Sequence, residues 1–132
     1  MNVSISPEVL QMESLLKKCR EENNPDRLLC HMQALKTFLV AHLIQQSTLV
    51  CQIKQGQELD GELEDLIIDE CSGCVGDSRK VMQKMHAFLR KFEDGDNLDT
   101  MEFRVEATRL LNRFEQSMAR FREWFEKYSR AA

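Results

Sequence analysis

The stretch from Leu28 to Ile53 constrains the fold more than any other part of the chain. It contains one charged residue, Lys36, whereas 30% of the whole sequence is charged. A helix that is apolar over most of its circumference must be surrounded by other elements. We therefore predict a central helix over about residues 25–55, enclosed by the rest of the chain. Its apolar residues fall into two adjacent helical rows: Leu28, Met32, Leu35, Leu39, Leu43 and Val50, beside Leu29, Val40, Ile44 and Cys51.

Capping and turn residues divide the remaining sequence into helices with short connections. Ser6-Pro7-Glu8 is typical of a helix start. Asn23-Asn24-Pro25 ends that helix near Glu22, and Asn24 caps the next one, which runs to Gln55 before Gly56. Asp99, followed three residues later by Glu102, predicts the cap of a last helix that reaches about Tyr128.

The region from Leu59 to Phe92 allows two interpretations. Its apolar residues nearly hold one helical phase, but Gly73 and Gly76 interrupt them. Each glycine costs about 1 kcal/mol relative to alanine in a helix interior, and good capping residues follow the second one. We predict two helices, about 60–71 and 78–93, and a single kinked helix is the alternative.

These patterns predict one all-α domain over residues 1–132. We expect a compact antiparallel bundle of four to five helices around the central helix at about 25–55. The length of 132 residues suffices to bury a core. Only 5 glycines and 2 prolines argue against an all-β sandwich, which needs many turns.

Charge, hydropathy and cysteine content argue against several function classes. A net charge of −4 gives no overall attraction to nucleic acid or to an anionic membrane. The least charged run, residues 37–53, is too short and too polar to span a bilayer. The first residues do not resemble a signal peptide, and the five cysteines are an odd number. We therefore expect an intracellular protein, cytoplasmic or nuclear, with reduced thiols.

No catalytic or cofactor motif stands out, and we predict a protein that is not an enzyme and holds no cofactor or metal. Cys71-Ser72-Gly73-Cys74 is a CxxC motif. In redox enzymes this motif follows a strand, whereas here it falls in a helical region, and a zinc site would need two more ligands at a useful spacing. We interpret the cysteines as buried apolar residues. A thiol- or metal-dependent role of the CxxC is kept as an alternative function.

Charge is unevenly distributed in the second half of the chain. Residues 57–77 contain eight acidic residues and no lysine or arginine, and residues 78–92 contain five basic residues and no acid. Two helices of opposite charge could neutralise each other across a shared groove. Alternatively, the acidic helix is a recognition surface, because complementary charge steers association and sets specificity.

We predict a protein–protein interaction module: an adaptor, regulatory or scaffold domain that binds another protein through an exposed helix face or an inter-helix groove. An aromatic residue between basic ones near the C-terminus is typical of interface hot spots, although such a tryptophan can instead seal the end of the bundle. The alternative is a homodimer, in which a second chain covers an open face of the central helix. The candidate partner-binding residues are Glu62, Asp65, Asp69, Arg120, Trp124 and Lys127.

Overall fold

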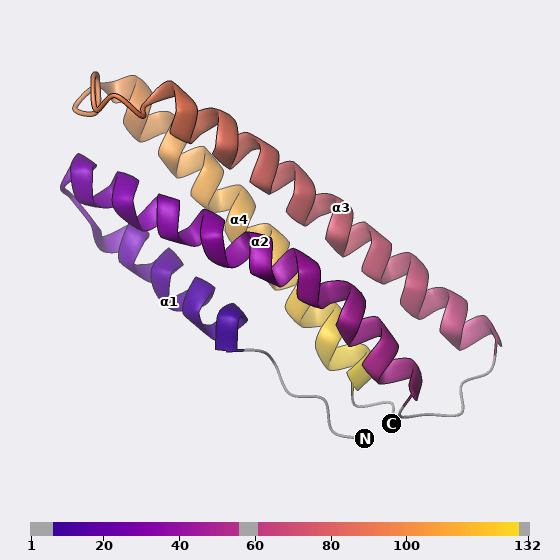
Figure 1. Cartoon of the computed structure of the whole chain (residues 1–132). Helices are drawn as coiled ribbons and strands as arrows, with labels where there is room; N and C mark the ends of the chain where they lie inside the picture. Colours follow the sequence, from indigo (N-terminus) through magenta and orange to yellow (C-terminus); the bar gives the residue numbers. More distant parts are fainter. Residues whose placement is uncertain (1–6, 56–60, 130–132) are drawn as a thin grey trace.

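The computed structural model describes residues 7–55 and 61–129, which form four helices and contain no strand. Consecutive helices run antiparallel and pack into a compact bundle (Figure 1). The prediction of an all-α bundle is confirmed, while the helix boundaries expected at Ser6 and Gly56 lie outside the described residues. The helices are α1 (Pro7–Glu21), α2 (Pro25–Gln55), α3 (Gly61–Lys91) and α4 (Met101–Ser129).

α3 is one continuous helix, so the prediction of two helices joined at residues 72–77 is wrong. Its buried face holds a single helical phase across both glycines, and burying that face outweighs the roughly 2 kcal/mol that two glycines cost. Ser78, which the two-helix prediction places at a helix start, is 2% exposed and lies within the helix. The buried residues of this face are Cys71, Cys74, Ser78, Val81, Met85 and Phe88.

Side-chain caps fix the starts of two helices. The Oδ1 atom of Asn24 accepts a hydrogen bond from the backbone N–H of Arg27 at 3.1 Å, as predicted. At the start of α4 the cap is Thr100, whose Oγ1 accepts from the backbone N–H of Phe103 at 3.3 Å. The prediction that Asp99 caps this helix is therefore wrong. The backbone of Asn97 has a left-handed conformation, with φ 64°. Its carbonyl oxygen accepts a 2.6 Å hydrogen bond from the Thr100 hydroxyl, which holds the Thr100 side chain at the helix start.

α2 has the predicted extent, but the other helices do not cover it on all sides. It packs on α1 and α3, while α4 packs on α3 and α1, so α2 and α4 lie diagonally across the core. Val40 and Ile44 are 41% and 68% exposed on the outward face of α2. α1 has 15 residues against 31 in α2, so it covers only part of the bundle's length (Figure 1).

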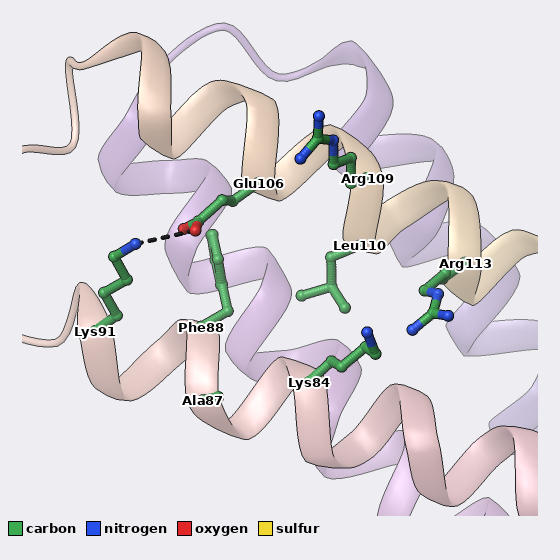
Figure 2. Close-up of a pocket in the computed structure, with 8 residues that line it drawn as sticks. All are labelled: Lys84, Ala87, Phe88, Lys91, Glu106, Arg109, Leu110 and Arg113. Atoms are coloured by element: carbon green, nitrogen blue, oxygen red, sulfur yellow. Dashed lines mark hydrogen bonds and ion pairs between the residues drawn. The ribbon is translucent and has the colours of Figure 1, made fainter.

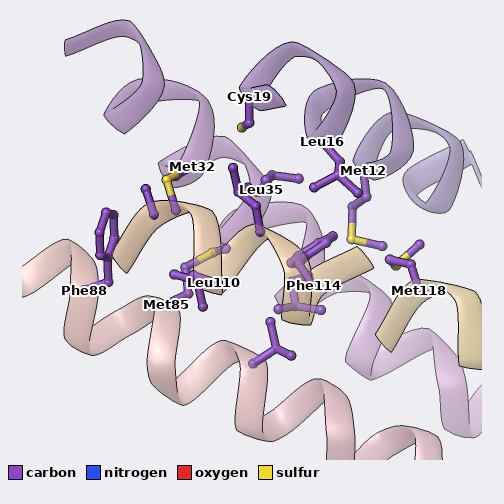
Figure 3. Packing of buried hydrophobic residues seen from close by; sticks show 14 of the residues in the cluster. Met12, Leu16, Cys19, Met32, Leu35, Met85, Phe88, Leu110, Phe114 and Met118 are labelled. Atoms are coloured by element: carbon purple, nitrogen blue, oxygen red, sulfur yellow. The ribbon is translucent and has the colours of Figure 1, made fainter. Parts of the chain in front are cut away.

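The core is built from side chains of all four helices. Where α3 turns into α4, the rings of Phe88, Phe92 and Phe103 lie with centroids between 5.0 and 5.4 Å apart. Leu66 shares the apolar phase of α3 in the sequence but is 51% exposed. A sulfur-rich layer follows along the bundle (Figure 3), made by Met12 and Leu16, Met32 and Leu35, Met85, Leu110, Phe114 and Met118.

Candidate functional site

The acidic and basic runs of the sequence lie one after the other along α3. Because they share one helix, they do not line a groove with each other, and the expectation that they neutralise each other is wrong. α4 instead supplies the opposite charges, with acids beside the basic end of α3 and bases beside its acidic half. The ion pairs are Lys91 with Glu102 at 2.6 Å and Glu106 at 2.9 Å, Arg120 with Asp77, and Lys127 with Glu70 at 3.2 Å.

The middle of the α3–α4 groove lacks this charge match. Lys80 and Lys84 of α3 line it together with Arg109 and Arg113 of α4. None of these four, which we name the central basic cluster, forms an ion pair or hydrogen bond with another residue in the described part of the chain. Lys84 and Arg113 reach toward each other across the groove (Figure 2). Because like charges repel, an anionic group bound between Lys84 and Arg113 would stabilise these two side chains in the groove.

The groove is hollowed where the central basic cluster lies. A hollow of about 380 Å³ is floored by Phe88 and Leu110, and the Lys91–Glu106 pair closes one end (Figure 2). A second hollow of about 280 Å³ shares Arg113 with the first and continues along the groove. Consecutive hollows along two antiparallel helices suit an elongated segment of a partner, with apolar atoms toward the floor and anionic groups toward the rim.

Two of the predicted C-terminal site residues line this groove beyond the central basic cluster. Arg120 is exposed and pairs with Asp77, whose hydrogen bond raises the pKa of the arginine. Lys127 is exposed and pairs with Glu70 at 3.2 Å. Trp124 borders the same part of the groove but is only 3% exposed, and its ring lies 5.9 Å from that of Phe121. Trp124 therefore fills the bundle interior.

The predicted acidic residues lie on another surface. Asp65 and Asp69 are exposed on the outward face of α3, and neither has an ion-pair partner among the described residues. The side chain of Glu62 lies outside what the structure describes. The predicted residues thus form two separate sets. The sequence-based site prediction included none of the four residues of the central basic cluster, although helical spacing places Arg109 and Arg113 on one row of α4 with Arg120.

The cysteines and the buried histidine have the properties of core residues. Burial raises the pKa of Cys71 to about 11 and also raises the pKa of Cys74, so both thiols stay protonated and weakly nucleophilic at neutral pH. Burial lowers the pKa of His42 to about 4, and its Nε2 accepts a hydrogen bond from the Gln46 amide at 3.1 Å. Among the described residues, no group of three or more His, Cys, Asp or Glu side chains is placed to hold a metal ion.

Comparison of the chain with protein families, with curated proteins and with solved structures gave no match. Within the described residues, no helix has the length and hydropathy that a membrane crossing requires.

Proposed function

We propose that this protein is a protein–protein interaction module that binds an acidic segment of another protein in the α3–α4 groove. The observation that carries the proposal is the central basic cluster, in which two lysines and two arginines from facing helices lie together without acidic partners in the described residues. The chain has more acidic than basic residues, with a net charge of −4, and elsewhere in the same groove acidic residues do pair with a cation, as Glu102 and Glu106 do with Lys91. Four cations that lie together without acidic partners repel one another, and an anionic ligand between them would relieve that repulsion.

The shape of the groove supports a helical or extended polypeptide as the ligand. Its floor is apolar, at Phe88 and Leu110, while its rim is cationic. An amphipathic segment matches both parts, because its apolar side chains face the floor and its carboxylates face the rim. Complementary charge would speed the encounter and set its orientation. This role is one of binding without catalysis, and it is the adaptor or scaffold role expected from the sequence.

We also propose that the protein lies inside the cell. Cys19, Cys71 and Cys74 are buried free thiols, and Cys30 is an exposed free thiol. An exposed unpaired cysteine beside several unpaired buried ones suits a reducing compartment.

The test compares the partners captured by the wild-type chain with those captured by Lys84→Glu/Arg113→Glu. Both substitutions reverse charge in the groove without touching the floor. We expect the double variant to lose the partners that carry acidic segments, and free poly-glutamate to compete for them in the wild-type experiment. Bound proteins are quantified by mass spectrometry.

The matched control is Lys17→Glu/Lys18→Glu, which makes the same charge change at two exposed positions on α1. The control should capture the wild-type set. If the groove variant captures that set as well, or if poly-glutamate has no effect, the groove is not the binding site and the proposal fails.

A further inference from the structure

A second charged surface, the outward face of α3, is unpaired within the described chain. Asp65, Asp69, Arg79 and Arg90 are exposed there, and none makes an ion pair or hydrogen bond with another described residue. Their spacing places them on one strip of the helix, opposite the buried face. The acids occupy the first half of the strip and the bases the second half, with Gly76 between them. We name this outward face, with its charged residues Asp65, Asp69, Arg79 and Arg90, the α3 strip.

The packing of the single chain does not require a glycine at position 76. A Cβ atom at this position would meet nothing within 4 Å, whereas one at Gly73 would meet the guanidinium of Arg120. Glycine destabilises a helix interior. Since no contact within the chain requires glycine at position 76, we look for its reason in a contact with another molecule. Glycine allows another backbone to approach closely. Ser72, one turn earlier on the same strip, is also small and exposed.

We propose that a second copy of this chain packs antiparallel on the α3 strip, with the two-fold axis at Gly76. Antiparallel pairing about residue 76 places position 69 opposite position 83, and position 65 opposite position 87. Asp69 then lies within one helical turn of Arg79 of the partner subunit, and Asp65 within one turn of Arg90 of the partner subunit. Because a two-fold interface uses the same patch on both copies, each contact occurs twice.

The order of charges along α3 selects this arrangement. A parallel pairing of two copies would set acids against acids and bases against bases, which is destabilising. Only the antiparallel pairing matches every charged position of the strip with its opposite. Leu66, which is 51% exposed at the edge of the strip, gains apolar cover near Ala87 of the partner subunit in the same arrangement.

The dimer is tested by sedimentation velocity on the purified chain over a dilution series. Exposed ion pairs are screened by salt, so the wild-type dissociation constant should rise at least about tenfold between about 50 mM and about 500 mM NaCl. Asp65→Lys/Asp69→Lys makes the strip wholly basic, and Arg79→Glu/Arg90→Glu makes it wholly acidic. Each variant alone should be monomeric, and an equimolar mixture of the two should form a heterodimer.

Controls separate a broken interface from a broken fold. Circular dichroism should be unchanged in both variants, since the substituted positions are exposed. Thermal unfolding is compared at a protein concentration below the wild-type dissociation constant, because dimer formation itself stabilises the fold, and there both variants should unfold close to the wild type. Lys17→Glu/Lys18→Glu on α1 should dimerise like the wild type. If the wild-type chain stays monomeric at all concentrations, if either α3 variant dimerises alone, or if the mixture stays monomeric, the proposal is overturned.

A covalent test locates the axis independently of charge. In a Cys30→Ser background, which removes the one exposed thiol among the cysteines that the structure describes, Gly76→Cys should oxidise readily to a disulfide-linked dimer because position 76 faces itself across the axis. Gln83→Cys faces position 69 and should cross-link much more slowly. Equal rates would place the axis elsewhere. Lys84 and Arg113 are intact in all these variants, so failure of the dimer and failure of the groove proposal are distinguishable.

Discussion

The guanidinium of Arg120 lies directly over Gly73, at a point where a Cβ atom would overlap its Nη2. The same guanidinium pairs with Asp77, one turn further along α3. The arginine of α4 therefore crosses the bare backbone of α3 to reach its carboxylate. This contact accounts for a glycine in the middle of a 31-residue helix, where it costs about 1 kcal/mol relative to alanine.

Substitution of the two glycines should therefore have unequal effects. Gly76→Ala should raise the free energy of unfolding by about 0.5–1 kcal/mol, because the new Cβ meets open space. Gly73→Ala should be nearly neutral, because the gain in helix propensity is offset by displacement of Arg120 from Asp77. Urea denaturation at low protein concentration measures both. In an Arg120→Ala background Gly73→Ala should recover the full gain, and a full gain without that change would contradict the argument.

Lys84→Glu should stabilise the isolated protein. The substitution removes one cation from the central basic cluster and sets a carboxylate near Arg113. We expect about 0.2–1 kcal/mol at low salt, and a smaller gain at high salt because exposed pairs are screened. Lys17→Glu, outside the groove, should give no such gain in the same urea titrations. A stabilised variant that no longer binds the partner would show that the cluster is kept for binding, whereas a destabilised variant would show that Lys84 serves the fold.

Protonation of His42 should set part of the acid sensitivity of the bundle. Burial lowers its pKa from 6.5 to about 4, and its ring meets that of Phe121 edge-on at 4.4 Å. The unfolded chain takes up a proton as the pH falls through 6.5, while folded His42 stays neutral until about pH 4. Stability is therefore lost across this window, by roughly 3 kcal/mol once the pH is below it.

The His42 prediction is checked by urea denaturation at several pH values between about 4 and about 7. His42→Leu should flatten the dependence of the free energy of unfolding on pH in this window. His86→Gln, at an exposed histidine bonded to Lys36, should leave the dependence in place. An unchanged slope in His42→Leu would mean that other groups carry the acid sensitivity.

Trp124→Ala should lower the stability of the fold and should have no specific effect on partner binding. The indole is 3% exposed against Phe121, and truncation of a buried aromatic residue costs about 3–5 kcal/mol. Since this is the one tryptophan of the sequence, its emission should be blue-shifted and poorly quenched by iodide in the native state. Normal stability of Trp124→Ala with specific loss of a partner would instead make Trp124 an interface residue.

The extents of α1, α2 and α4 could be predicted because their determinants are local. Asn24 and Pro25 act within one turn, and the apolar rows set the length of each helix. α3 was misread because the penalty for Gly73 is visible in the sequence, while its explanation, Arg120, lies on another helix. The burial that keeps α3 continuous likewise depends on its contacts with α2 and α4.

The groove was beyond prediction for a related reason. Which rows of α3 and α4 face each other depends on the rotation of each helix about its axis, and an apolar stripe fixes this only to within a row or two. The sequence shows Lys84 in a basic run and Arg113 in a row of arginines, but it does not show that the two side chains face each other across one groove. Trp124 shows the opposite error, because its polar neighbours in sequence suggest a surface, whereas its side chain is buried.

Because several thiols are buried, their reactivity measures how often the bundle opens. Cys19 on α1 and Cys71 and Cys74 on α3 are shielded, while Cys30 is accessible. An alkylating reagent reaches Cys19 only when α1 detaches, and it reaches the α3 thiols only when α3 separates from its neighbours. The alkylation rates of the two groups therefore measure the lifetimes of two parts of the native structure, without any introduced label.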